Sequence, residues 1–466
     1  MVTCERPVYR ASVAPSSQRR PALGLTALLL AASLASSPAW ANGRPPSSVS
    51  VATRPGGREV LVATTFGVLL SKDNGCSFHW LCEQSIGFGG TFDPKYAIGG
   101  DGTLYATTFE GLRVSRDGGC TFSTATEGTP ATDPGALDGI WVDAIDLAPG
   151  GDVWIATAES GRYNDVYRSR DAGRTFRPMG LHSAAIWWKS IKVAPSSPSR
   201  IYATGYQVAG TAPDGGQLPP TAHLRRSDDG GQTWTAMPLH TVAVAVTPIV
   251  HVLAVDPSHA DTLYLRSAAA APPAGDRLYR STDGGASFTE VLVTPERIAG
   301  VVVRQDHVLV AAGTAGVHES RDGGASFTAI AGAPHLACLH ERGDGELLGC
   351  GTNWDPDFFA VGRSSDGHDW QKVFRFGEMS GPLACPAGTV QHETCEVSLW
   401  PSLREQFGAS GATCVSEPAD APAPPVRARA GCCDTSSGGG PLGAGALTAL
   451  ALLARGLRRR KAGVAA

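Results

Sequence analysis

The sequence predicts an all-β protein, a seven-bladed β-propeller of four-stranded antiparallel blades, and three observations support this fold. The chain has 57 glycines and 33 prolines among 466 residues, which favours short strands joined by tight turns. One octapeptide occurs seven times, with successive copies starting 39 to 58 residues apart, a spacing typical of propeller blades. Apolar, strand-like segments recur at the same places around each copy.

The octapeptide reads Ser-x-Asp-x-Gly-x-Ser/Thr-Phe/Trp, and each fixed position serves a tight hairpin. The Asp carboxylate accepts hydrogen bonds from turn amides, the Gly supplies a positive φ, and the aromatic side chain buries apolar area. The seventh copy, Ser364–Trp370, is one residue short and lacks the second Gly. The aspartates expected to have this structural role, rather than a catalytic one, are Asp73, Asp117, Asp171, Asp229, Asp283, Asp322 and Asp366.

The segments around each octapeptide predict the four strands of a blade. An apolar first strand ends in a turn with Pro, as in Ile191–Pro195, and a second strand follows, as in Ile201–Thr204. A short third strand, such as Arg277–Arg280, leads into the octapeptide, which turns the chain into the fourth strand. Seven such units form a radial propeller from about Ser48 to Phe376, and closing the ring supplies the core.

In these residues the chain resembles the Asp-box, or BNR, repeat families. They include sialidases, xyloglucan-active glycoside hydrolases, the sortilin family and a photosystem assembly factor. The resemblance covers roughly residues 48–376. It implies a β-propeller and is nearly silent about chemistry, because the same fold serves many functions.

Residues 1–41 are predicted to be a signal peptide. Four arginines precede the apolar stretch Ala22–Ala35, and Ala39–Ala41 is a small-x-small cleavage site. The alternative is a transmembrane anchor, for which the apolar stretch is short. Residues 42–376 would then form the propeller of an exported protein.

The cysteines agree with export. Of eleven, Cys4 lies in the signal peptide and two lie in the tail, which leaves an even number that predicts disulfides. Cys338 and Cys350 flank the turn Gly343–Gly345 symmetrically, so a cross-strand bridge between them is expected. No spacing indicates a metal site, and no cofactor is expected. Connectivity stays open for the remaining six, Cys76, Cys82, Cys120, Cys385, Cys395 and Cys414.

Three further segments follow the propeller. Residues 377–416 form a Cys-containing extension, in which Leu399–Phe407 is expected to contain one short helix started by Pro401. Residues 417–430 form a Pro/Ala linker. Residues 431–466 contain an uncharged run long enough to span a membrane and a final basic cluster that would stay cytoplasmic.

The last segment resembles the MYXO-CTERM sorting signal of myxobacteria, which has a Gly-Cys, a short transmembrane helix and a terminal Arg cluster. The resemblance implies processing by a sorting protease near Cys432 or Cys433, and display at the cell surface or outer membrane, anchored or released. The alternative is a plain C-terminal membrane anchor that is never cleaved. In either case the propeller lies outside the cytoplasm.

The same reasoning points to a binding face. In a propeller the 3–4 turns, here the Asp boxes, lie on one face, and the 2–3 loops and 4–1 links lie on the other, around the channel mouth where ligands usually bind. Aligning the first strands on their Pro places two tryptophans together, and a set of charged residues together, near this mouth. Long 2–3 loops, at Glu159–Asn164, Tyr206–Ala222 and Asn353–Phe358, add further candidates. The candidate ligand-binding residues are Trp141, Asp143, Glu159, Trp187, Lys189, His251 and Trp354.

Aromatic rings beside charges suit the recognition of a sugar or a peptide. An alternative is that Trp141 and Trp187 simply pack between blades. Plain solvation is the favoured interpretation of Glu110 and Glu159, which follow second strands. The charged fraction of 18% and net charge of −4 provide no basic field for nucleic acid.

An enzymatic role is the alternative to binding. A sialidase-like site needs a carboxylate-clamping arginine triad, a Tyr–Glu nucleophile pair and an Asp acid/base, and sialidases tend to carry an early Phe/Tyr-Arg-Ile-Pro motif. Pro295–Ile298 and Ser199–Ile201 do not match that motif. No catalytic residue is assigned, and lone histidines such as His182, His240 and His335 are interpreted as loop or core residues.

The sequence therefore predicts a surface-displayed binding or scaffold propeller for an extracellular glycan or protein. The alternative is a glycoside hydrolase, sialidase-like or xyloglucanase-like, with a divergent active site. Assembly or chaperone roles, as in the sortilin and photosystem-factor relatives, form a third possibility.

Overall fold

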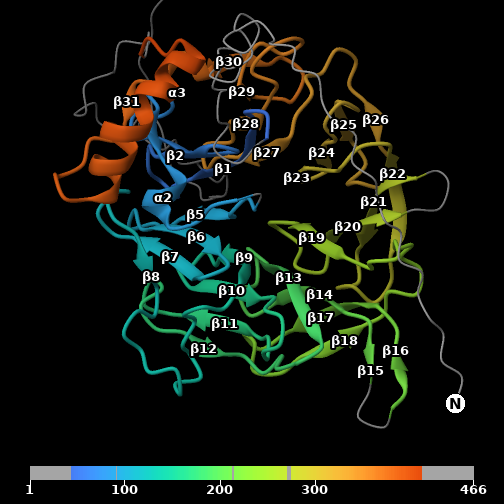
Figure 1. Cartoon of the computed structure of the whole chain (residues 1–466). Coiled ribbons are helices and arrows are strands. Elements are labelled where there is room, and N and C mark those ends of the chain that lie inside the picture. The colour runs from blue at the N-terminus through green and yellow to red at the C-terminus, as the bar shows by residue number, and fades with distance from the viewer. Residues whose placement is uncertain (1–43, 91, 212–214, 270–273, 412–466) are drawn as a thin grey trace, which may run out of the picture. The chain divides into compact units, whose positions relative to one another are not determined.

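The computed structural model describes residues 44–90, 92–211, 215–269 and 274–411. These residues form seven four-stranded antiparallel sheets in a ring, and within each sheet the strands lie side by side in chain order. The prediction of a seven-bladed β-propeller is confirmed (Figure 1).

The first four blades span residues 48–237. Blade 1 contains β1 (Ser48–Thr53), β2 (Val60–Thr64), β3 (Gly67–Ser71) and β4 (His79–Leu81). Blade 2 contains β5 (Tyr96–Ile98), β6 (Leu104–Thr108), β7 (Gly111–Ser115) and β8 (Ser123–Thr124). Blade 3 contains β9 (Val142–Leu147), β10 (Val153–Thr157), β11 (Val166–Ser169) and β12 (Arg177–Pro178). Blade 4 contains β13 (Ile186–Val193), β14 (Ile201–Gln207), β17 (Thr221–Ser227) and β18 (Thr235–Met237).

The last three blades span residues 250–374. Blade 5 contains β19 (Val250–Val255), β20 (Leu263–Ala269), β21 (Gly275–Ser281) and β22 (Thr289–Thr294). Blade 6 contains β23 (Gly300–Arg304), β24 (His307–Ala311), β25 (Val317–Ser320) and β26 (Thr328–Ala329). Blade 7 contains β27 (Cys338–Glu341), β28 (Leu347–Cys350), β29 (Val361–Ser364) and β30 (Gln371–Phe374).

The 2–3 connection of blade 4 is more regular than expected from sequence. Residues 206–222 were predicted to be a long loop, but β14 and β17 extend into it, and a small hairpin of β15 (Gly210–Thr211) and β16 (Gln217–Leu218) lies between them. Backbone pairing continues because Gln207 stays in register with Thr221.

The first strands of neighbouring blades contact one another and surround the central channel (Figure 1). The second strands lie deeper in the blades, and β2, β6 and β10 are buried along their whole length. Both faces of a second strand are covered by neighbouring blades, which explains why these strands are apolar throughout. The core is therefore a series of layers between blades.

Large side chains of the second strands explain why the Asp box needs its conserved Gly. Tyr105 of blade 2 lies against Gly173 in the box of blade 3, and Trp154 of blade 3 lies against Gly231 in the box of blade 4. A Cβ at either glycine would come within 2.9 Å or 2.8 Å of the aromatic ring, and both glycines have positive φ. Only Gly satisfies the turn and the packing together.

The seventh Asp box was predicted to lack the second Gly, and the structure corrects this detail. Gly367 donates its backbone N–H to Ser364 Oγ at 2.9 Å, and a Cβ there would meet Leu309 of blade 6. It therefore occupies the position of the Gly that packs on the preceding blade, and the residue lost is the one before it. His368 follows where the other boxes have a turn residue.

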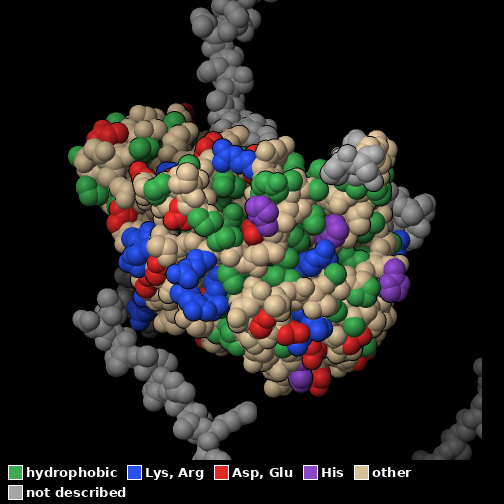
Figure 2. Space-filling model, turned by 90° about the horizontal axis from the view of Figure 1, so that it is seen from below, with side chains coloured by type: hydrophobic (Ala, Val, Ile, Leu, Met, Phe, Trp, Pro, Cys, Tyr) green, Lys and Arg blue, Asp and Glu red, His purple; other side chains and the backbone are tan. Residues whose placement is uncertain are grey.

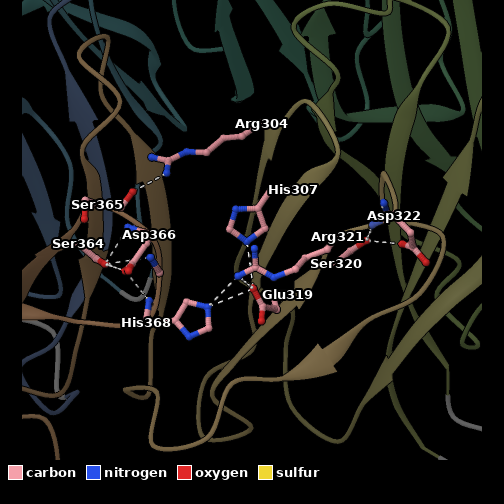
Figure 3. A network of polar contacts seen from close by, with 12 residues as sticks. Arg304, His307, Glu319, Ser320, Arg321, Asp322, Ser364, Ser365, Asp366 and His368 are labelled. Atoms are coloured by element: carbon pink, nitrogen blue, oxygen red, sulfur yellow. Dashed lines mark hydrogen bonds and ion pairs between the residues drawn. The ribbon is translucent and has the colours of Figure 1, made fainter. Parts of the chain in front are cut away.

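A polar network around the seventh box joins blades 6 and 7 (Figure 3). One carboxylate oxygen of Glu319 lies 2.8 Å from Arg321, 3.2 Å from His307 and 3.1 Å from His368. Arg304 also donates to the carbonyl oxygen of Ser365 at 2.7 Å. These contacts hold the shortened box against its neighbour.

The ring closes without strand exchange inside a blade, a point that the sequence left open. Ser48 of β1 donates to the carbonyl oxygen of Ala360 in blade 7 at 2.7 Å. After β30 the chain passes through η2 (Phe376–Glu378), and β31 (Gly381–Pro382) then pairs in parallel with β4 on the outer edge of blade 1. The C-terminal part of the chain thus straddles the junction between the first and last blades.

The extension continues with a π-helix, η3 (Gln391–Leu399), and α3 (Trp400–Phe407), which has Pro in its first turn as expected. A short α2 (Glu83–Ile86) follows β4. In Figure 1, α3 is drawn orange-red beside the blue strands of blade 1. Phe407 packs on Phe66 with ring centroids 5.0 Å apart, so α3 extends the core of blade 1.

Disulfides fix this arrangement. Cys82 is bonded to Cys395, and Cys120, in the second Asp box, is bonded to Cys385. Cys338 and Cys350 face each other in β27 and β28 and are bonded, as the hairpin spacing predicts. Cys76 is also disulfide-bonded, so all seven cysteines of the described residues are oxidised. Disulfides are compatible with an extracellular protein.

The predicted signal peptide, Cys414, the linker, and the tail with Cys432 and Cys433 lie outside the described residues. In the part of the chain that is described, no helix has the length and apolarity of a membrane span. Figure 2 shows a second view of the molecule, in which side chains of both charges are interspersed with hydrophobic and uncharged ones.

Candidate functional site

Two β-bulges at the start of the first strands build the centre of the site. Asp143 in β9 and Lys189 in β13 are each an extra residue in the pairing with the second strand of their blade. Such bulges re-aim a side chain, and here the two side chains form an ion pair between blades 3 and 4. Asp143 is only 4% exposed.

Lys95 of blade 2 completes this centre. Its ammonium group donates to the backbone oxygen of Asp143 at 2.5 Å and to that of Lys189 at 3.2 Å, and lies 3.5 Å from the Asp143 carboxylate. One side chain therefore connects the first strands of three consecutive blades across the channel. Burial lowers the pKa of Lys95, although Asp143 counteracts this shift.

Aromatic rings from blades 2, 3 and 4 lie next to these charges. Trp141 contacts Trp187 at a centroid distance of 5.9 Å and Phe109 at 4.9 Å, and Lys189 lies 4.5 Å above the Trp141 ring. A cation over an aromatic face is attractive. We name this group the aromatic strip, and its members are Phe92, Phe109, Trp141, Trp187 and Tyr206.

Six of the seven candidate residues come together. Glu159 accepts the backbone N–H of Trp141 at 2.9 Å and so positions the ring. His251 in β19 lies within range of the charges of Lys95 and Lys189, and burial with these cations holds its pKa well below the ordinary value. Trp354 belongs elsewhere, because it packs on Phe376 of the group beside α3.

The sequence reasoning missed Lys95, Phe92, Phe109 and Tyr206. Blade 2 has Gly99-Gly100 where the first strands of blades 3, 4 and 5 end in Pro, so alignment on Pro could not place Lys95. Phe109 lies in a two-residue turn between β6 and β7. The sequence signal for Phe109 is its position directly after Thr107-Thr108, at the end of a strand.

Two arginines extend the charged group toward blades 5 and 6. Arg266 lies 3.6 Å from the carboxylate of Asp276 and donates to the carbonyl oxygen of Ile298 at 3.1 Å. Burial and the nearby Arg297 lower the pKa of Arg266 to about 10. Arg297 is exposed on the link between blades 5 and 6. The mouth of the channel therefore carries more cations than carboxylates.

Exposed aromatic side chains are confined to the face that carries the 2–3 loops. Within the described residues they are Phe109 (44% exposed), Tyr163 (59%), Trp354 (52%) and Phe358 (49%). Each lies between the second and third strands of its blade. Exposed hydrophobic side chains gathered on one face indicate an interaction surface.

Comparison with protein families supports the repeat. The chain matches the BNR/Asp-box repeat over residues 225–236, the fourth box. No curated protein sequence matches the chain.

Among solved structures, the GH74 xyloglucanase of Xanthomonas campestris is 15% identical with a TM-score of 0.41, covering 69% of this chain and 66% of that one. The GH74 enzyme of Niastella koreensis is 15% identical with a TM-score of 0.39, covering 70% and 65%. The alignments thus span just under two thirds of these enzymes. YCF48 from Cyanidioschyzon merolae is 14% identical with a TM-score of 0.44, covering 66% and 94%.

A separate cavity of about 560 Å³ opens at the other end of the channel, beside the Asp boxes. Its walls are the last residues of first strands and the turns that follow them, and they are mostly apolar, with Leu147, Val193 and Leu253 among them. Asp146 and Lys192 form an ion pair of 2.8 Å in its lining. The sequence predicted ligand binding at the opposite face and did not predict this cavity.

The pKa values and contacts of the carboxyl groups bear on acid–base chemistry. Among the described residues, Asp165 is the carboxyl group whose pKa is raised, and burial is the cause. It is 2% exposed and accepts the backbone N–H groups of Val166 and Leu181 at 2.7 and 2.8 Å. This carboxyl group holds a turn and does not face a site. No cluster of three metal-ligating side chains occurs in the described ranges.

Proposed function

We propose that this protein is an extracellular binding module that recognises a glycan or protein ligand with the face carrying its 2–3 loops. The observation that carries the proposal is the gathering of exposed aromatic side chains on that face. The aromatic strip lies there beside Lys189 and Asp143, and rings beside charged groups suit ligands with both apolar and polar surfaces.

Binding is favoured over the alternative of glycoside hydrolysis by the state of the carboxyl groups. Hydrolysis needs a carboxylic acid with a raised pKa next to the scissile bond and a second carboxylate about 5–10 Å away. Asp143 is paired with two lysines, and Asp165 is buried under backbone hydrogen bonds. These arrangements support positioning roles for both groups.

A glycan array probed with the full-length chain tests this proposal. Phe109→Ala should weaken binding of any ligand found by tenfold or more, because central aromatic contacts often contribute at least ~2 kcal/mol. Val397→Ala is the matched control, because Val397 is 58% exposed in η3 of the extension and is not a member of the aromatic strip. Equal binding by Phe109→Ala and the wild type would argue against the aromatic strip as the site.

We further propose that the chain is exported through residues 1–41 and displayed by its C-terminal segment after processing at Cys432 or Cys433. The disulfides of the propeller support an extracellular destination. A variant with Cys432→Ala and Cys433→Ala should lose accessibility to protease added to intact cells. Unchanged accessibility would rule out processing at these cysteines.

A further inference from the structure

The charges at the channel mouth do not cancel. Burial lowers the pKa of His251, and the charges of Lys95, Lys189, Arg266 and Arg297, which lie close enough to influence it, lower that pKa further. The carboxylates paired with this group are those of Asp143 and Asp276. Because His251 stays neutral, four cations face these two carboxylates and that of Glu159, which lies beside Trp141.

The pairing within this group shows which cation is available to a ligand. Lys95 donates to Asp143 and to backbone oxygens, Lys189 is paired with Asp143, and Arg266 is held by Asp276 and Ile298. Arg297 is exposed and makes no hydrogen bond or ion pair with other described residues. It is the cation that can meet an anionic group without breaking an existing contact.

The aromatic strip gives the ligand a second property. Successive rings from Phe109 through Trp141 and Trp187 to Tyr206 lie 4.9, 5.9 and 5.8 Å apart and cross from blade 2 to blade 4. A surface of this kind suits a chain of rings with apolar faces. An extended peptide that binds by strand addition uses an exposed sheet edge instead, whereas the strip consists of side chains at strand ends and turns.

We infer that the ligand is an anionic polysaccharide, carboxylated or sulfated, whose sugar rings lie along the aromatic strip while its anionic groups meet the cations of the channel mouth. This inference rests on the proposed binding function. It explains why Lys95 and Lys189 lie beside tryptophans and why Arg297 is left without a partner. Anions that pair with arginine form strong, charge-assisted hydrogen bonds.

Affinity measurements on the full-length chain with defined polymers test the inference. The probes are polygalacturonate, which is carboxylated, dextran sulfate, neutral xyloglucan and poly-glutamate. We expect polygalacturonate or dextran sulfate to bind more tightly than xyloglucan or poly-glutamate, and the stronger of the two identifies the anionic group. Arg297→Gln should weaken that binding about tenfold, and Phe109→Ala should weaken it as well.

Arg170→Gln is the matched control, because Arg170 is an exposed arginine of the third Asp box with the same charge. It should leave affinity unchanged. Tight binding of xyloglucan that depends on Phe109 but not on Arg297 would overturn the inference and leave the proposed function intact. Equal binding of poly-glutamate, or equal loss in Arg170→Gln, would reduce the effect to general charge and overturn the inference. Polymer binding that Phe109→Ala does not weaken would overturn both.

Discussion

At the scale of single residues, the Asp box is a dense hydrogen-bonding unit. The carboxylate of Asp171 accepts the hydroxyl groups of Ser169 and Thr175 at 2.7 and 2.6 Å and the N–H groups of Arg174 and Thr175 at 3.0 and 2.9 Å. Burial alone would raise the pKa of Asp171, but these bonds outweigh it and lower the pKa to about 2. The seventh box lacks the hydroxyl residue that closes this pattern.

Removing the carboxylate should therefore cost more in a complete box than in the shortened one. Asp171→Ala should lower the free energy of unfolding by ~2 kcal/mol, since hydrogen bonds to charged groups contribute about this much. Asp366→Ala should cost less, because Asp366 accepts only Ser364 and two amides, and the Glu319 network supports that turn. Melting temperatures of the two variants would check this, and equal losses would contradict it.

The same carboxylates predict sensitivity to acid. Hydrogen bonds, first among them the one from Thr233, lower the pKa of Asp229 to about 2, as in Asp171. Unfolded aspartate titrates near ~3.9. The stabilisation is therefore fully present above about pH 4 and is lost as the pH falls toward about 2. A melting temperature that stays constant between pH 5 and pH 2 would contradict this prediction. Among the carboxyl groups of the described residues, buried Asp165 has a raised pKa, so its contribution to the pH dependence of stability has the opposite sign.

At the scale of elements, the C-terminal extension is attached to the first two blades. β31 adds to the edge of blade 1, and Gln391, which is fully buried, donates to the carbonyl oxygen of Trp80 at 2.8 Å. The bond between Cys120 and Cys385 joins residues 265 positions apart, whereas Cys338 and Cys350 are 12 apart. Only the first of these crosslinks restrains the extension.

Loss of the bond between Cys120 and Cys385 should loosen the extension before it loosens the blades. In a Cys120→Ala and Cys385→Ala variant, limited proteolysis should cut within residues 377–411 at least tenfold faster, since a disulfide typically contributes 2–4 kcal/mol to stability, about 30-fold or more in the equilibrium. The matched variant Cys338→Ala and Cys350→Ala should not accelerate cleavage there. If both variants are cut in the extension at the same rate, β31, the helices and the bond between Cys82 and Cys395 hold it without the bond between Cys120 and Cys385.

At the scale of the whole molecule, the ring is held by contacts between blades, and the channel mouth is one of them. Lys95, Asp143 and Lys189 join blades 2, 3 and 4 by charge at the first strands. A buried ion pair is costly to break on one side, because the remaining charge loses its partner.

Asp143→Ala should accordingly destabilise the whole ring. It leaves two lysines facing each other in the channel, and breaking a buried pair in this way costs about 3–5 kcal/mol. The half-exposed surface pair Arg54–Glu59 serves as a control, because Glu59→Ala should cost at most about 1 kcal/mol. Chemical denaturation followed by tryptophan fluorescence would measure both, and similar losses would mean that the central charges do not hold the blades.

Much of this architecture was predictable, and particular residues show where prediction stopped. The spacing of the Asp boxes predicted seven blades because each hairpin requires the same few residues locally. Cys338 and Cys350 were predictable for the same reason, since one turn places them opposite each other. Cys120 and Cys385 were not, because their proximity depends on the path of β31 across the ring.

The sequence by itself determined the blade count, the strand order and which face carries the long loops, because these follow from local turn chemistry and the period of the repeat. Only the tertiary structure decided what meets at the channel mouth. The bulges that aim Asp143 and Lys189 at each other, and the reach of Lys95 across two blades, arise from packing between strands distant in sequence. Local sequence patterns do not encode contacts between strands that are distant in sequence, so the site could be identified only in the closed ring.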